Sequence, residues 1–105
     1  MNLQRFRQSL KSERPPRGLC APLRALWHEA KGNWDTAHRI VQEEGGKAGA
    51  RVHAYLHRRE GDLSNADYWY ARAGSERPSS ALGKEWEALV RSFLDESTKA
   101  ERQDP

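Results

Sequence analysis

The chain is poor in cysteine, in apolar residues and in long hydrophobic runs, and each shortage excludes a class of protein. Cys20 is the only cysteine among the 105 residues, so neither an internal disulfide nor a paired-cysteine metal site can form. Hydrophobic residues make up 36% of the chain, and no run is long enough to cross a bilayer or to follow the basic N-terminus as a signal peptide. We therefore expect a cytoplasmic protein without a membrane partner.

Familiar catalytic patterns are also missing. The sequence has no glycine-rich phosphate loop and no nucleophile elbow, and no glutamate follows His53 to complete a zinc-protease helix. The serines fall where turns and helix caps are expected. These absences predict a protein that is not an enzyme and that needs no cofactor.

The clearest positive feature is a short internal repeat with a spacing of 29 residues. The matched pairs are His28 with His57, Gly32 with Gly61, Asn33 with Asp62, Trp34 with Leu63, and Ala37 with Ala66. A glycine ends one helix and the polar residue after it caps the next, so the repeat predicts stacked helical hairpins. No segment alternates apolar and polar residues for long enough to predict a strand.

The apolar spacing predicts an all-α fold of stacked antiparallel hairpins, with about five helices and a capping C-terminal helix. The expected parts are a basic N-terminal arm that can form a short helix at 3–12 (1–21), two hairpin repeats (22–78), a capping helix (79–97) and a polar tail (98–105). Within the repeats we expect helices at 22–31, 34–44, 47–60 and 63–73. A single domain of about 100 residues can hold such a fold.

The second hairpin resembles a tetratricopeptide repeat. The residues that carry the resemblance are the two small residues, the aromatic residue and the proline: Ala66, Ala73, Tyr70 and Pro78. The first copy departs from this pattern, because Val41 replaces the aromatic residue and no proline follows. Two phrases, 26–35 and 52–73, also resemble a group of small bacterial proteins of this kind, which implies a fold and no activity.

The resemblance implies a protein or peptide partner, held in a groove that the first helices of the hairpins line. In this chain the groove would present Arg51, Tyr55, Arg58 and Arg59, which would favour an acidic or extended peptide. The helical pattern, in contrast, places Tyr55 on the apolar face. Both hold only if the N-terminal segment or a second subunit covers the groove, so a monomer and a homodimer are both expected alternatives.

A second candidate contact lies in the run of three aromatic residues at 68–70. Successive helical residues are rotated by about 100°, so the three side chains cannot all face the core. If Trp69 and Tyr70 pack inward, Tyr68 lies nearer solvent, beside Arg72. An exposed tyrosine beside an arginine can anchor a partner.

Two alternative functions remain open from the sequence. His53 and His57 lie four residues apart on one helix face, and His28 occupies the repeat position of His57, so the three could bind a metal ion. The same histidines could instead be packing residues or pH-sensitive groups. The second alternative is nucleic-acid binding through the basic arm, which we favour less because no aromatic residues interleave its charges.

Overall fold

The computed structural model describes the backbone of residues 1–102 and the side chains of residues 1–97. The described part contains no strand and six helices: α1 (Leu3–Ser9), α2 (Ala21–Ala30), α3 (Trp34–Glu44), α4 (Gly46–Glu60), α5 (Leu63–Arg72) and α6 (Leu82–Arg102). The all-α class is confirmed, but the count of five helices is wrong. The polar character predicted for the tail at 98–105 lies outside the described side chains.

The extra helix is α1, which belongs to the core. Phe6 on α1 has no exposed surface, and its ring lies 5.8 Å from the ring of Trp86 on α6. Asn2 caps the start of this helix, because its side chain accepts a hydrogen bond from the Arg5 backbone N–H. The N-terminal segment is therefore a folded part of the domain.

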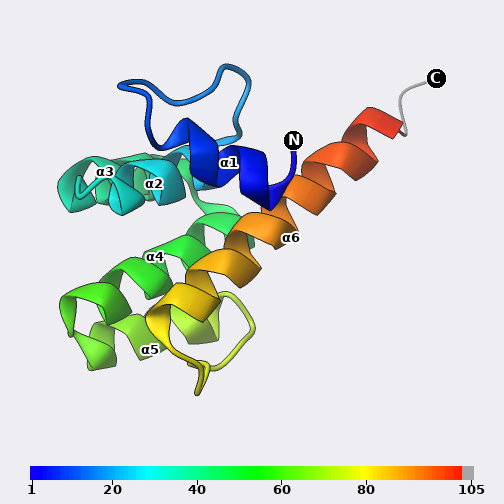
Figure 1. The fold of residues 1–105 in the computed structure, drawn as a ribbon. Coiled ribbons are helices and arrows are strands. Elements are labelled where there is room, and N and C mark those ends of the chain that lie inside the picture. The colour runs from blue at the N-terminus through cyan, green and yellow to red at the C-terminus, as the bar shows by residue number, and fades with distance from the viewer. Residues whose placement is uncertain (103–105) are drawn as a thin grey trace.

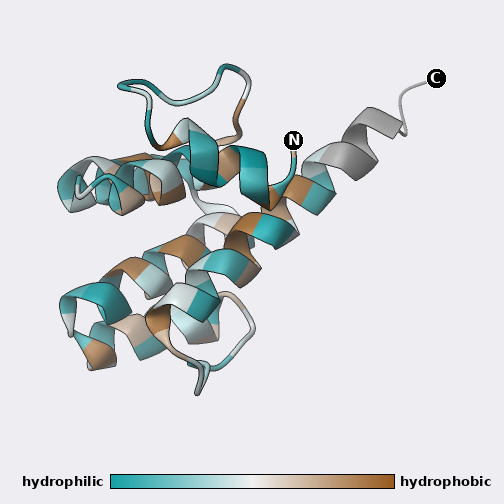
Figure 2. Cartoon of the chain, viewed as in Figure 1, coloured by the Kyte–Doolittle hydropathy of each residue, from teal (hydrophilic) through white to brown (hydrophobic). Residues whose placement is uncertain are grey.

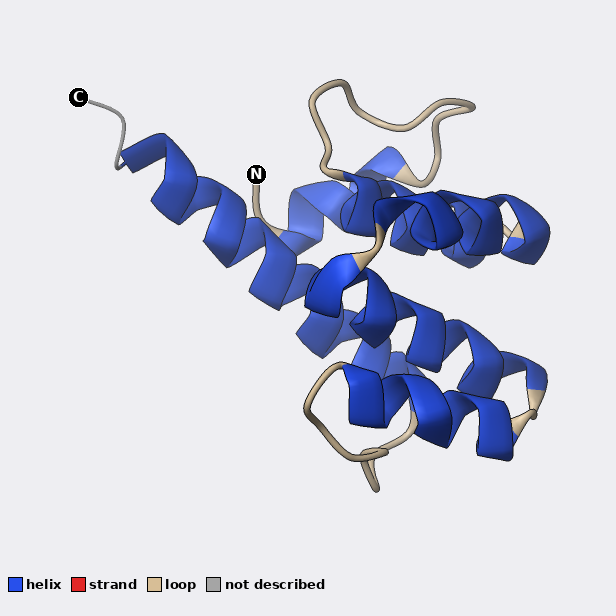
Figure 3. Ribbon diagram, turned by 180° about the vertical axis from the view of Figure 1, so that it is seen from behind, coloured by secondary structure: helices blue, strands red, loops and turns tan. Residues whose placement is uncertain are grey.

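The helices form two antiparallel hairpins and a long covering helix (Figure 1). The α2–α3 and α4–α5 pairs are the hairpins, and α3 packs on α4 to stack them. Helix α6 crosses the first helix of each hairpin, α2 and α4, and also carries α1. Seen from behind, the links within the hairpins are short, whereas longer loops precede α2 and α6 (Figure 3).

The matched glycines of the repeat end α2 and α4, as the sequence predicts. Gly32 and Gly61 have φ angles of +89° and +90°, a left-handed conformation that side chains disfavour. Asp62 then caps α5 by accepting a hydrogen bond from the Asn65 backbone N–H at 3.3 Å. Asn33 occupies the corresponding position before α3, but its side chain makes no capping hydrogen bond.

Each helix buries one apolar stripe against its neighbours. Apolar positions recur between polar ones along the helices, as Figure 2 shows in brown and teal. Leu26 on α2, Leu56 on α4 and Val90 on α6 have no exposed surface, so one core joins the two hairpins to α6. Among the described residues, no helix combines the length and the apolarity needed to cross a membrane.

Candidate functional site

Helix α6 occupies the surface that the tetratricopeptide resemblance assigns to a peptide. The indole N–H of Trp86 donates to the Leu26 carbonyl oxygen at 3.2 Å, which fixes α6 against α2. On the α4 side, Glu85 is 7% exposed and accepts a hydrogen bond from Arg58 at 2.8 Å. The groove is therefore covered by the C-terminal helix of the same chain, whereas the sequence patterns led us to expect the N-terminal segment or a second subunit there.

The arginines predicted to line this groove contact the protein itself. Arg59 forms an ion pair with Glu29 at 3.2 Å, and the Arg51 guanidinium lies 5.0 Å from the centre of the Phe93 ring. Arg58 is held by Glu85. These three side chains stabilise the packing of α2, α4 and α6.

Tyr55 lies on the apolar face of α4, as the helical pattern predicts, and not in an open groove, as the repeat resemblance implies. The side chain is 2% exposed, and its hydroxyl donates to a Glu29 carboxylate oxygen at 3.3 Å. Burial raises the pKa of the Tyr55 hydroxyl, and the neighbouring Glu29 carboxylate raises it further. Burial likewise raises the pKa of Glu29. Tyr55 is thus an internal hydrogen-bonding residue.

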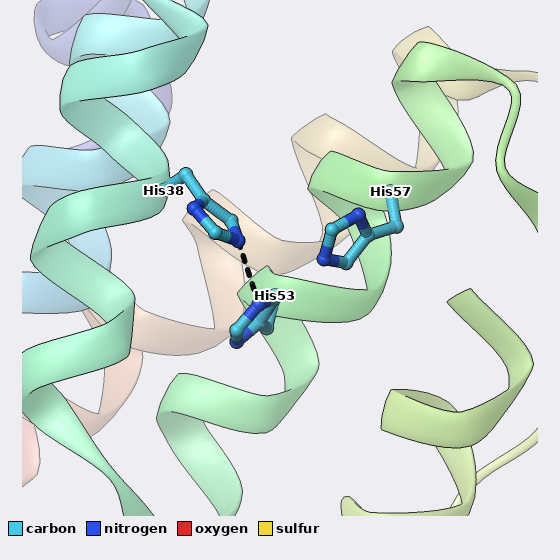
Figure 4. Close-up of side chains that lie close together, drawn as sticks. All are labelled: His38, His53 and His57. Atoms are coloured by element: carbon cyan, nitrogen blue, oxygen red, sulfur yellow. Dashed lines mark hydrogen bonds between the residues drawn. The ribbon is translucent and has the colours of Figure 1, made fainter. Parts of the chain in front are cut away.

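A cluster of three histidines lies between α3 and α4 (Figure 4). The histidine cluster consists of His38, His53 and His57, whose candidate ligand nitrogens all lie within 4.8 Å of one another. The Nε2 atoms of His38 and His53 form a hydrogen bond of 2.9 Å. The predicted pair on α4 therefore meets a third histidine that comes from α3.

His28, the third histidine expected at this site, lies elsewhere. Its ring contacts Trp27 edge-on at 5.1 Å, and its Nδ1 atom is buried without a hydrogen-bond partner. In the described residues His28 belongs to no group that could hold a metal ion. His38 takes its place; its spacing of four residues from Trp34 puts both on the face of α3 that packs on α4.

Two indole rings and one carboxylate hold the histidine rings in place. Trp34 stacks on His38 with ring centres 4.8 Å apart, and Trp69 stacks on His53 at 3.8 Å. The Nδ1 atom of His57 lies 2.7 Å from a Glu60 carboxylate oxygen. Every ring of the cluster therefore has a fixed orientation.

Burial keeps two of the three rings neutral at pH 7. It lowers the pKa of His53 to about 4, and the nearby His38 and His57 add to the effect. The pKa of His38 is lowered by burial and then by His57. A neutral ring carries one proton and one free lone pair, so one of the two bonded Nε2 atoms donates and the other accepts.

A pocket of ≈ 550 Å³ adjoins the cluster at the turn between α3 and α4. We call it the cationic pocket; its charged, histidine and aromatic lining residues are Lys47, Arg72, His53 and Trp69, and no carboxylate lines it. The first turn of α4 forms another part of the wall, and no side chain caps that helix terminus. This turn adds partial positive charge to the pocket.

Arg72 lines this pocket and contacts Tyr68, which is exposed as the helical spacing predicts. Tyr68 is 54% exposed, and its hydroxyl accepts a hydrogen bond from Arg72 at 3.2 Å. The Arg72 guanidinium also lies 5.5 Å from the centre of the Trp69 ring. Of the six residues predicted to bind a partner, Arg59, Tyr68 and Arg72 are exposed, but Arg59 is paired with Glu29.

Helix α1 and the loop that follows it are held against the rest of the protein, although most basic side chains of this segment are exposed. Arg7 forms an ion pair with Glu87 at 2.6 Å and lies 5.4 Å from the centre of the Trp86 ring. Lys31 donates to the carbonyl oxygens of Leu10 and Ser12, which ties the following loop to α2. These contacts hold α1 and its loop in the fold.

Comparison of the chain with family models, with curated proteins and with solved structures gives no match. The resemblance to tetratricopeptide repeats therefore stays a prediction.

Proposed function

We propose that the chain is a non-enzymatic interaction module that binds an acidic, extended peptide in the cationic pocket. The observation that carries the proposal is the combination of Lys47, Arg72 and the uncapped first turn of α4 around a pocket without carboxylates. The sequence also predicts an acidic or extended peptide as the ligand. The proposed site, however, is on α4 and α5 and not in the covered groove.

The two cations of the pocket differ from the arginines of the groove because no acidic side chain neutralises them. Within the described residues Lys47 forms no ion pair, and the contacts of Arg72 are the aromatic rings and the Tyr68 hydroxyl. Arg58 and Arg59, in contrast, are each paired with a buried glutamate. A carboxylate that enters the pocket would therefore meet unpaired positive charge from three directions.

The expected affinity is modest. A hydrogen bond to a charged group contributes about 1.5–3 kcal/mol, so one from Lys47 and one from Arg72 give about 3–6 kcal/mol. That range corresponds to dissociation constants from several millimolar to tens of micromolar. Tyr68 and Trp69 offer aromatic surface for an apolar residue next to the acidic one, which favours a peptide over an isolated anion.

The test compares a labelled glutamate-rich peptide with its glutamine counterpart by fluorescence anisotropy. We expect Lys47→Gln and Arg72→Gln each to weaken binding of the acidic peptide by about 10–150-fold, the loss of one hydrogen bond of roughly 1.5–3 kcal/mol. Arg5→Gln is the matched control, because Arg5 is exposed on α1, outside the pocket, and its loss changes net charge equally.

Three results would contradict the proposal. They are equal binding of the two peptides, equal losses in all three variants, and full binding by the Lys47→Gln, Arg72→Gln double variant. Equal losses would mean that the peptide responds to net charge alone. Binding of a phosphate-bearing but not of a glutamate-rich peptide would also reject the carboxylate as the recognised group.

A further inference from the structure

The histidine cluster brings three nitrogen ligands to one point, and the geometry points to a binding site there for a single divalent transition-metal ion. The ligands are one ring nitrogen each from His38, His53 and His57, and the ion belongs to the zinc, nickel and copper class. Nothing in peptide binding at the cationic pocket requires this ion, so the inference goes beyond the proposed function.

The distances between the rings suit such an ion. A zinc ion binds histidine nitrogen at about 2.0–2.1 Å in tetrahedral geometry, which separates two ligand nitrogens by about 3.3 Å. The Nε2 atoms of His38 and His53 are 2.9 Å apart, and one ring nitrogen of each of the three histidines lies within 4.8 Å of the other two. Seating the ion therefore widens the separation between the His38 and His53 nitrogens by about 0.4 Å and brings the third nitrogen closer by at most about 1.5 Å.

The protons of the cluster can be arranged for binding. The ion takes the position of the hydrogen bond between His38 and His53; the ring whose Nε2 donates that bond transfers its proton to Nδ1 through solvent, so that both rings then carry their single proton on Nδ1. The carboxylate of Glu60 accepts a hydrogen bond from Nδ1 of His57, which leaves the Nε2 lone pair of that ring free. A ligand histidine whose other nitrogen contacts a carboxylate is the usual outer-sphere arrangement at metal sites.

A second possible set of ligands, made by His57 with two carboxylates, is less favourable because those carboxylates have other partners. His57 also lies close to Glu60 and Asp62. However, one Asp62 oxygen accepts the capping hydrogen bond from the Asn65 backbone, and Glu60 holds His57 Nδ1. These carboxylates therefore support α5 and the imidazole, while the three rings supply the ligands.

The donor set selects the class of ion. Three imidazoles without a carboxylate favour zinc, nickel or copper over magnesium and calcium, which prefer oxygen. Three protein ligands leave a fourth position on a tetrahedral ion. His53 lines the cationic pocket, so water from that pocket can take the fourth position.

The test uses the full chain without an affinity tag, stripped of metal by a chelator and titrated with Zn(II), Ni(II) or Cu(II) alone. Calorimetry and equilibrium dialysis with elemental analysis should give one ion per chain. His38→Gln and His53→Gln should each weaken binding by more than the roughly 10–100-fold that loss of an outer-sphere partner costs, and Glu60→Gln should fall within that range. His28→Gln is the matched control and should bind as the wild type does.

A second measurement needs no variant. Nuclear magnetic resonance of the ¹⁵N-labelled imidazoles should show Zn(II) shifting the ring nitrogens of His38, His53 and His57 while those of His28 stay unchanged. The inference is overturned if the wild type binds no ion saturably, if His38→Gln retains full affinity, or if all four histidines respond alike. Arg72→Gln, which weakens peptide binding in the proposed function, should retain the ion, so the two proposals can fail separately.

Discussion

Lowering the pH from 7 to 4 should destabilise the metal-free protein, and His53 should account for most of the change. The folded protein lowers the pKa of this ring from its ordinary value of 6.5 to about 4. Between these values the unfolded chain binds the proton more readily than the folded chain does. The free energy of unfolding therefore falls as the pH falls through this window. The stabilising contribution of neutral His53 is fully present above pH 6.5.

The magnitude follows from the size of the pKa difference. One pKa unit corresponds to about 1.4 kcal/mol, so the pKa difference of His53 sets an upper limit of about 3.5 kcal/mol on its contribution between pH 6.5 and 4. Burial opposes a positive charge on this ring most strongly, and His38 from α3 and His57 from the next turn of α4 add to the effect. His38 has a lowered pKa of its own and adds a contribution of the same sign.

The measurement is urea denaturation followed by circular dichroism at several pH values between 7 and 4, with a chelator present. The comparison is between the wild type and His53→Gln, because Glu29 acts in the opposite sense: burial raises its pKa above 4.5, so its protonation stabilises the folded chain as the pH falls. We expect His53→Gln to remove about 2–3 kcal/mol of the pH dependence. If the two proteins lose stability in parallel as the pH falls, the assignment to His53 is refuted.

Two further predictions concern α6 and the repeat turns. Trp86→Ala should cost about 3–5 kcal/mol in urea denaturation, because it removes a buried ring together with its hydrogen bond to the Leu26 carbonyl; a cost below 1 kcal/mol would show that α6 is not anchored there. Gly61→Ala should cost about 1–2 kcal/mol because φ is +90° at that residue. Gly83→Ala is its matched control in α6, where open space surrounds the added methyl group, and should stabilise by about 0.5–1 kcal/mol; equal effects of the two alanines would reject the conformational argument.

The helices were predictable because local residues determine them. Gly32 and Gly61 end the first helices of the hairpins, and the spacing from Leu82 to Leu94 predicts the last helix from its apolar stripe. The glycine positions and the apolar spacing are local features of the sequence. Helix formation depends on residues within a few positions of each other, so these features predict the helices.

The histidine cluster was only half predictable because it depends on where each hairpin lies in the stack. His28 and His57 occupy the same position of the repeat, but α4 packs between α3 and α5, whereas α2 has no preceding hairpin. Of this repeat-related pair, only His57 therefore contacts a histidine from the neighbouring hairpin. The terminal unit of a repeat stack has different neighbours, so equivalence in sequence does not give equivalence in contacts.

The position of α6 is the reason that the proposed binding surface is the cationic pocket and not the predicted groove. Glu85 lies 27 residues after Arg58, and no local pattern relates the two. A peptide that bound the predicted groove would have to displace α6, and loss of the Trp86 contacts alone costs about 3–5 kcal/mol. That cost exceeds the roughly 1.5–3 kcal/mol that one freed arginine would recover from a carboxylate. Because Lys47 and Arg72 can be reached without this displacement, an acidic peptide should bind the cationic pocket and leave α6 in place.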